Sequence, residues 1–517
     1  MSSLRTERGF VARCSALIAF APMLAVSTLA PAATVAPRVL DSANRDGSVD
    51  VILVLADQTR PLLAPLCQDG DALIRRNALV AALRARAEAT QPGLREWFTA
   101  RGIAHRDFWI VNLIQARLPM SALYELAARG DIARIEANPQ IALRLPEPEA
   151  GPFASPRAAD LAAGVAWGVA KIEAPAVWSA GVSGQGIVIG GEDTGYQWDH
   201  PALKPQYRGW NGTKANHNFN WHDAVHDAAS EPVCGNDSPV PCDPNRHGTH
   251  TAGTFAGDDG ASAAPRHQVG VAPGAKWIGC RNMDMNGNGT PARYIECMQW
   301  MLAPTDLKGR HANPDLAPDV ISNSWSCTPS EGCTLGSEIQ AAVGALVEAG
   351  ILYVAAAQNS GPACATIPDP PATYAASFDV GATDSNDALA GFSSRGPVSG
   401  SVQVRPDLSA PGVSVCSSIP ANSYTCDFSG TSMAAPHVAG AAALLMSAFP
   451  ALKGHPDRVA AILRATATTA GISNTPGVTQ SCGGTPITQW PNYMAGYGRV
   501  DVWSAFHEVV FVDDFGG

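Results

Sequence analysis

The N-terminal part of the chain alternates apolar and polar positions in a pattern typical of a small unit of strands and helices. The pattern predicts strands over residues 49–55, 108–118 and 132–145 and helices over 71–101 and 121–128. This order predicts a separate α+β unit over residues 33–150. A stretch rich in proline and small residues, Pro146 to Pro156, then indicates an exposed, cleavable connection, so we assign residues 151–164 as a linker.

A second pattern begins near residue 165, where short apolar runs alternate with stretches of helical periodicity. It predicts strands over 184–191, 275–281, 319–324 and 351–357 and helices over 249–256, 291–302 and 336–349. Alternating strands and helices form a parallel β-sheet with helices on both faces, so residues 165–517 belong to the α/β class. Such sheets bind their ligands at the carboxyl ends of the strands.

The residues that follow Ser432 are apolar on every side of a helix, which is typical of a helix buried in a core. The N–H groups of a first helical turn have no partners within the helix, so they can stabilise a developing anion, and Pro436 near that end costs little. Ser432 is therefore a candidate nucleophile. The alternative is that Ser432 only caps the helix, as serine often does.

A serine nucleophile needs a base and a third group that orients the base. Asp193 follows a predicted strand, and a carboxylate there can accept the imidazole N–H of a histidine. His247 opens a helix rich in small residues and is the candidate base. Asn359 follows another predicted strand, and its amide could join the Ser432 N–H as a donor to an oxyanion.

Four motifs carry a resemblance to a known family. They are Asp193-Thr194-Gly195, His247-Gly248-Thr249-His250, Asn359-Ser360-Gly361 and Gly430-Thr431-Ser432-Met433-Ala434-Ala435-Pro436. Over about residues 165–506 the chain resembles the subtilisin-like serine peptidases, with the motifs in that family's order. The resemblance implies Ser432 as nucleophile, His247 as general base and then general acid, and Asp193 as the orienting carboxylate. It also implies Asn359 as oxyanion donor.

The resemblance implies a function as well. The chain would be a secreted serine endopeptidase that hydrolyses protein or peptide substrates through an acyl-enzyme on Ser432, with no cofactor in the chemistry. Residues 33–150 would be a propeptide that acts as an intramolecular chaperone and inhibitor, with its C-terminal tail in the substrate cleft until it is cleaved. The protein would therefore be made as a self-processing zymogen.

Residues of the substrate cleft are also implied by the resemblance. They are Ser324, Trp325, Ser326, Gln358 and Gly289. Gln358 stands where the family usually has glycine on the wall of the main specificity pocket, which indicates a smaller or more polar pocket. Trp325 replaces an aliphatic residue in a strand that is expected to pair with the substrate backbone.

Composition and the N-terminus indicate an exported globular protein. The 517 residues are 46% apolar and 16% charged, which is enough for a large core, and a net charge of −11 without basic runs argues against nucleic acid as a partner. Arginines followed by an apolar run and Ala30-Pro31-Ala32 are typical of a signal peptide over residues 1–32. The run is too short for a membrane anchor. We expect a monomer secreted to the periplasm or the medium.

Cysteine usage agrees with export. Cys14 would leave with the signal peptide and Cys67 with the propeptide, so ten of the twelve cysteines remain, an even number suited to an oxidising compartment. We favour the short-range pairs Cys234–Cys242, Cys327–Cys333 and Cys416–Cys426, which leaves Cys280–Cys297 and Cys364–Cys482. The alternative is a set of free core thiols.

Candidate metal ligands give a weaker signal. The run from Asp284 to Gly289 begins like a calcium loop, but Ile295 stands where a bidentate glutamate belongs, so we interpret the run as a turn. The resemblance also allows structural calcium, although Ala202 replaces the aspartate that many relatives carry after the His-Pro pair.

Four histidines have spacings that could suggest a metal. They are His217, His222, His226 and His250. We predict a solvated loop for the first three, because no further ligand completes a tetrahedral set, and a packed helix residue for His250.

Two rival functions come from other classes. An exported, catalytically silent binding protein would keep the same fold without turnover, and a peptide-hydrolysis assay separates it from an enzyme. A related acid peptidase would use glutamate as its base. His247 predicts instead that activity falls as the pH drops through the ordinary imidazole pKa of about 6.5, because protonated imidazole cannot accept the serine proton. Highest activity near pH ~4 would contradict His247 as the base.

Overall fold

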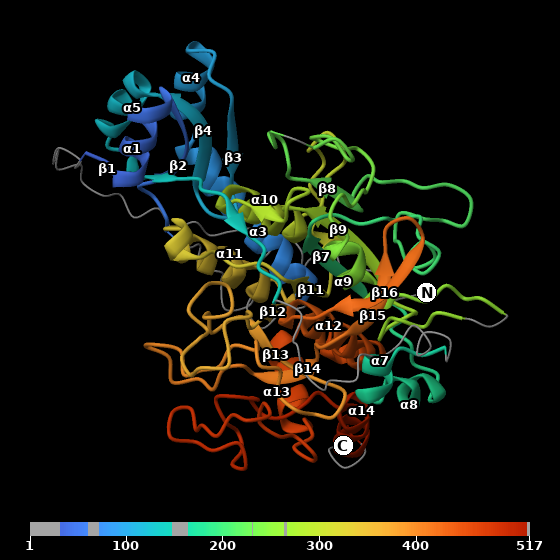
Figure 1. Ribbon diagram of the computed structural model, residues 1–517. Coiled ribbons are helices and arrows are strands. Elements are labelled where there is room, and N and C mark those ends of the chain that lie inside the picture. The colour runs from blue at the N-terminus through green and yellow to red at the C-terminus, as the bar shows by residue number, and fades with distance from the viewer. Residues whose placement is uncertain (1–31, 60–71, 147–163, 230, 263–265, 514–517) are drawn as a thin grey trace, which may run out of the picture.

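The computed structural model describes residues 32–59, 72–146, 164–229, 231–262 and 266–513. The predicted signal peptide lies almost entirely outside the described residues, as does most of the predicted linker. The described chain forms an N-terminal unit, drawn in blue in Figure 1, and a larger unit from residue 164 onwards.

Seven parallel strands form the central sheet of the larger unit, in the order β14-β13-β12-β11-β7-β9-β8. Their bounds are β7 Val188–Asp193, β8 Trp221–Asp223, β9 Lys276–Arg281, β11 Val320–Asn323, β12 Leu352–Ala356, β13 Phe378–Thr383 and β14 Leu408–Pro411. The predicted α/β class with a parallel sheet is confirmed. Strands β8, β13 and β14 were not predicted. Strands β8 and β14 have only three and four residues, and Asp379 and Gly381 interrupt the apolar run of β13.

Helices cover both faces of this sheet. Successive strand residues point to opposite faces, so that Val320 packs on one side and Ile321 on the other. One face carries α9 (His247–Ala256), α12 (Thr431–Ala448), α13 (Pro456–Ala465) and α14 (Val502–Asp513), and the other carries α10 (Pro291–Leu302) and α11 (Gly336–Glu348). Helices α7 (Trp167–Lys171) and α8 (Ala174–Ser179) and the hairpin of β15 (Val415–Ile419) and β16 (Ser423–Phe428) complete the unit.

The N-terminal unit is a five-stranded sheet, in the order β1-β5-β2-β4-β3, packed against its own helices. Its strands are β1 Thr34–Val35, β2 Ser48–Leu55, β3 His105–Phe108, β4 Leu113–Pro119 and β5 Ile132–Ala137, and its helices are α1 Pro37–Asp46, α3 Ala72–Thr90, α4 Pro92–Ala100 and α5 Met120–Ala127. The expected α+β unit is present, although α1 was not predicted.

Three predicted boundaries in this unit are wrong. The helix predicted over 71–101 is two helices, because Pro92 has no N–H to continue α3 and begins α4 instead. The strand predicted over 108–118 is the antiparallel hairpin β3–β4, whose turn at residues 109–112 is apolar because it packs against the larger unit. The strand predicted over 132–145 ends at Ala137 and resumes as β6, Ile141–Ala142.

The N-terminal unit lies against α10 and α11 (Figure 1) and shares an apolar cluster with them through α3. Its polar side chains reach groups at the ends of both helices. Asn138 Oδ1 accepts from the N–H of Ala292 in the first turn of α10 (3.0 Å). Arg75 and Arg76 donate to the carbonyls of Glu348 (2.8 Å) and Ala349 (3.0 Å) at the end of α11. These contacts satisfy helix-end groups that have no partner within the helix.

All ten cysteines from Cys234 to Cys482 are paired, in the five combinations expected from the sequence. Two of these bridges lie near the cleft: Cys234–Cys242 precedes α9, and Cys327–Cys333 closes a short loop after β11. None of the helices in the described ranges is both long and apolar enough to cross a bilayer.

Candidate active site

Three neighbouring strands end in one row. In the sheet order, β11 lies between β7 and β12, and Asn323 at the end of β11 is level with Glu192 and Ala355. Asp193 is the last residue of β7, Ser324 directly follows β11, and Asn359 follows β12, so all three lie at the carboxyl ends of adjacent parallel strands. This is the edge where ligands of such sheets bind.

His247 is the first residue of α9 and lies directly against Asp193. Its Nδ1 is 2.6 Å from Asp193 Oδ1, and both side chains are buried. The carboxylate is held in turn by the N–H of Thr194 (2.7 Å) and the hydroxyl of Thr251 (3.2 Å). A carboxylate can only accept, so Nδ1 donates, and Nε2 is left as the acceptor. Among the described residues, Nε2 has no hydrogen-bond partner.

Two glycines allow α9 to approach the end of β7 this closely. A Cβ on Gly248 would lie 2.0 Å from the carbonyl oxygen of Gly195, and one on Gly195, whose φ is +119°, would lie 1.9 Å from the carbonyl oxygen of Cys242. Only glycine fits either position. The glycines of the two motifs thus set the distance between Asp193 and His247.

Asp243 is a supporting residue that the sequence reasoning missed. Its buried carboxylate accepts from the hydroxyl of Thr194 (3.0 Å) and from the N–H (2.9 Å) and hydroxyl (2.6 Å) of Thr249. It therefore joins the β7 end to the first turn of α9. Burial raises the pKa of Asp243, and these hydrogen bonds oppose that shift. An acid just before a helix start, here four residues before His247, is a recognisable sequence signal.

Ser432 is the second residue of α12, which is buried from Thr431 to Met446 as predicted. Pro436 has no N–H to donate to the Ser432 carbonyl, and Ser324 Oγ donates to that carbonyl instead (3.3 Å). Helix α12 packs against α9, with Gly440 beside the Phe255 carbonyl. The start of α12 is thereby joined to the strand end at β11, beside the helix that carries the histidine.

Asn359 is oriented by its contacts with the start of α12. Its Oδ1 accepts from the N–H (2.9 Å) and the hydroxyl (3.0 Å) of Thr431, so its NH₂ group faces away from that helix. The NH₂ group donates to the carbonyl oxygen of Arg144 (3.0 Å), which belongs to the tail of the N-terminal unit. An amide that contacts a backbone carbonyl in this way is suited to stabilise an oxyanion on it.

A second carboxyl, that of Glu192, is buried directly before Asp193 in the chain. Glu192 is fully buried, and this burial raises its pKa to about 8. It is therefore largely uncharged at neutral pH. Glu192 therefore adds little negative charge next to the His247–Asp193 pair.

The tail after β5 lies along the cleft edge. Strand β6 pairs antiparallel with β10 (Asn288–Gly289), with Ile141 opposite Gly289, and the N–H of Leu143 donates to the carbonyl of Gly287 (2.8 Å). The run from Asp284 to Gly289 is a turn closed by its own backbone and the Asp284 carboxylate.

The remaining predicted cleft residues lie nearby. Trp325 is buried and stacks on Tyr294 at 4.0 Å, and Ser326 Oγ is 3.2 Å from Thr328 Oγ1. Gln358 has a positive φ of 76° and donates its amide to the Asp369 carbonyl (2.7 Å). Their roles toward substrate stay predictions.

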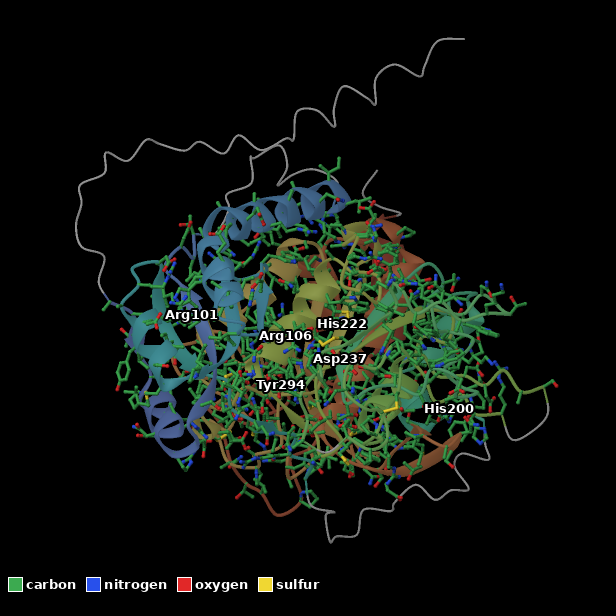
Figure 2. All side chains as sticks on the ribbon, turned by 90° about the horizontal axis from the view of Figure 1, so that it is seen from above. Arg101, Arg106, His200, His222, Asp237 and Tyr294 are labelled. Carbon is green, nitrogen blue, oxygen red and sulfur yellow. A yellow bond between two sulfur atoms is a disulfide. The ribbon has the colours of Figure 1, made fainter. Side chains whose placement is uncertain are left out.

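The solvated loop predicted for the three clustered histidines is wrong. His222 and His226 both contact Glu296 Oε1 through Nε2 (2.8 and 2.9 Å), and His226 also contacts Asp237. Figure 2 labels His222 and Asp237 together with Arg106 of β3, whose charge acts on His226. The sequence did not indicate this cluster because Glu296 is supplied by α10, about seventy residues away.

Neither the remaining histidines nor the position after the His-Pro pair offers a metal site. His217 hydrogen-bonds Tyr207, and the buried His250 contacts the Val415 carbonyl (3.0 Å), as expected for a packed helix residue. Burial lowers the pKa of His250 to about 3. Ala202 is buried, and its side chain has no oxygen to take the place of an aspartate carboxylate as a calcium ligand. In the described ranges, no three or more His, Cys, Asp and Glu side chains are grouped to hold a metal.

A parallel sheet with a His–Asp pair at its carboxyl edge and a serine at the start of a buried helix defines the class of serine hydrolases. Comparison with known proteins agrees: residues 184–484 match the model of the subtilase family. The chain is 33% identical over 449 residues to bacillopeptidase F of Bacillus subtilis (strain 168), a match that covers 84% of this chain and 29% of that protein. It is 31% identical over 315 residues to subtilisin Savinase of Lederbergia lenta, covering 60% of this chain and 94% of Savinase. The chain belongs to the subtilase family and is a serine-type peptidase.

Replacing Gly248 by alanine should disturb the His247–Asp193 pair. The new Cβ would overlap the Gly195 carbonyl, and forced shifts of this kind cost about 1–3 kcal/mol. We expect lower stability in thermal unfolding, measured in a Ser432→Ala background, and lower kcat in the active enzyme. Gly336→Ala, in the same unit, is the control, because its Cβ would meet only Tyr374 at 3.7 Å and Pro370 at 3.8 Å. Equal stability of the two variants would contradict the packing argument.

Asn359→Leu should keep the shape of the side chain and remove the amide donor. We expect kcat to fall about 100- to 1000-fold with little change in KM, a range taken from loss of such a donor in a subtilisin. Ser360→Ala, at the neighbouring position, is the control. If KM rises and kcat holds, the amide acts in binding and not on the oxyanion.

The pH dependence of stability should reveal the His226–Glu296 contact. Burial lowers the pKa of His226, but the hydrogen bonds to Glu296 and Asp237 outweigh it and raise the pKa above its ordinary value. The stabilisation is therefore fully present below about pH 6.5 and is lost as the pH rises through the folded-state pKa. In urea unfolding, His226→Gln should cost more stability at pH ~5.5 than at pH ~9. In a Glu296→Gln background, His226→Gln should cost the same stability at both pH values. If the pH dependence of this cost persists there, another group causes it.

Proposed function

We infer that the protein is a secreted, self-processing serine endopeptidase. Ser432 attacks a peptide carbonyl while Nε2 of His247 takes its proton, and the carboxylate of Asp193 stabilises the imidazolium. The amide of Asn359 stabilises the oxyanion. His247 then gives the proton to the leaving amine, and water releases the acyl group from Ser432.

The observation that carries this proposal is the position of the tail. Residues 141–144 lie antiparallel to the β10 edge, and the Arg144 carbonyl accepts from Asn359. A backbone that occupies the cleft in this way blocks other peptides, which supports the N-terminal unit as an inhibitor. The alternative of a silent binding protein has no comparable support, because it gives no reason for Asn359 to contact this carbonyl.

Contacts between the units support a chaperone role as well. Asn138 satisfies a donor at the start of α10, and Arg75 and Arg76 satisfy carbonyls at the end of α11. A unit that binds the folded helices shifts the equilibrium toward the folded state. The match to bacillopeptidase F is longer than residues 165–517, so it extends into the N-terminal unit. This supports the view that the N-terminal unit and the peptidase unit occur together in this family.

The remaining parts of the proposal rest on the sequence. Export follows from the signal-like N-terminus and agrees with the five disulfides. The mature enzyme would act as a monomer on protein or peptide substrates, without a cofactor in the chemistry. Structural calcium stays a prediction of the resemblance, and the position of Ala202 does not fit it.

The test is expression of the full chain as wild type and as Ser432→Ala, followed by N-terminal sequencing and a casein digest. We expect only the wild type to shed its N-terminal unit and to digest casein, because the variant lacks the nucleophile. Ser447→Ala, in the same helix but bonded to the Gln185 carbonyl, is the control and should mature normally. Processing of pure Ser432→Ala at the same bond would refute self-maturation, and a wild type without hydrolysis would favour the silent binding protein.

A further inference from the structure

Arg144 occupies the place of the residue whose carbonyl is attacked, if the proposed function holds. Ile141 pairs with Gly289, Leu143 donates to Gly287, and the next carbonyl along the chain, that of Arg144, accepts from the Asn359 amide. The chain then continues past the start of α12: Pro146 Cδ lies 3.6 Å from where a Cβ on Gly430 would be. The bond between Arg144 and Leu145 is therefore the one presented to Ser432.

The side chain of Arg144 is met by a carboxylate of the larger unit. Its Nε is 3.2 Å from Glu331 Oε1, and its Nη2 contacts the same oxygen. The second oxygen, Glu331 Oε2, accepts from the N–H of Ala142 (3.3 Å). The Glu331 carboxylate thus binds both the Arg144 side chain and the backbone N–H two residues before it. A peptide in the cleft would offer it the same two groups.

Glu331 is held in place by covalent and polar constraints. It ends a short 3₁₀ turn, Pro329–Glu331, inside the loop that the Cys327–Cys333 disulfide closes. The N–H of Cys327 donates to the Pro370 carbonyl (2.8 Å), so this loop packs on the segment that contains Asp369. Burial raises the pKa of Asp369, and the charge of Arg144 opposes this shift.

We propose that Glu331 selects arginine immediately before the scissile bond, and that the zymogen first cuts itself between Arg144 and Leu145. In that cut, Ser432 Oγ bonds to the Arg144 carbonyl carbon and its proton passes through His247 to the Leu145 nitrogen, which leaves as an amine. Water then attacks the ester, which releases the Arg144 carboxylate and restores Ser432. The substrate class is proteins and peptides with an accessible arginine, with the charge of the guanidinium read by Glu331.

Mass spectrometry of the released N-terminal fragment tests the position of the cut. We expect the fragment to end at Arg144 and the new N-terminus to begin at Leu145. Arg144→Glu should slow processing about tenfold, because an ion pair with a partly exposed partner changes such a rate by about a factor of ten. Arg144→Lys should slow it less, because lysine keeps the positive charge. Combining Arg144→Glu with Glu331→Arg should restore processing. A fragment that ends elsewhere, or no rescue by the exchanged charges, would overturn the proposal.

Small substrates test selectivity apart from the N-terminal unit. The mature enzyme is assayed with the p-nitroanilide of Ile-Ala-Leu-Arg, its own tail, and with versions that carry Gln, Leu or Phe in place of the arginine. We expect the highest kcat/KM for arginine, and Glu331→Gln should lower the arginine-to-glutamine ratio about tenfold. The Arg144 side chain is 74% exposed, so the ratio should also fall with added salt.

Glu338→Gln is the matched control, because Glu338 also forms an ion pair with an arginine of the N-terminal unit, Arg134. It should leave the arginine-to-glutamine ratio unchanged. If wild type cleaves all four peptides equally, or if Glu331→Gln keeps the ratio, Glu331 does not select arginine. If none of the peptides and no casein is cleaved by wild type, the proposed function itself fails.

Discussion

The register of three parallel strands determines the geometry of the whole site. Asn323 lies level with Glu192 on one side and Ala355 on the other, so the chain leaves β7, β11 and β12 at the same height. Asp193 is the last residue of β7, and Ser324 and Asn359 follow the ends of β11 and β12. A slip of one residue would exchange the side chains that a strand presents to the helices on the two faces, so the packing on both buried faces specifies this register. Helices α9 and α12 then only need to start at this edge for His247 and Ser432 to reach it.

The sequence predicted the helices and strands whose apolar residues are all explained by the burial of that helix or strand. Helix α10 has the predicted bounds, and the central strands were found because both of their faces are buried. The prediction was wrong where residues are apolar because they pack against the other unit. Residues 109–112 form a turn, yet Ile110 and Val111 are apolar because they pack against the larger unit. A local window cannot distinguish this packing from a strand interior.

The same distinction explains which site residues were found. Asp193, His247, Asn359 and Ser432 stand in motifs whose glycines and small residues carry a local signal. Asp243 acts through Thr194 and Thr249, and its local signal is only that of a helix start.

Other groups had no local signal at all. Glu296 meets two histidines from a distant segment, and Glu331 meets Arg144 across almost two hundred residues. Contacts of this kind depend on the three-dimensional arrangement of the units, and periodicity carries no information about them.

The contact between Glu331 and Arg144 must serve two opposite needs. Before cleavage it helps to hold the tail in the cleft, and after cleavage the same arginine, now with a free carboxylate, has to leave. The side chain of Glu331 is only 16% exposed whereas that of Arg144 is 74% exposed, so the arginine keeps most of its contact with water. An ion pair with one partner largely in water is worth about one factor of ten, which is enough to favour arginine but not enough to hold the cleaved tail in the cleft. The firm contacts to the N-terminal unit lie instead at the ends of α10 and α11. They are made by Asn138, Arg75 and Arg76, which all precede the bond that is cut, so they can persist after the cut.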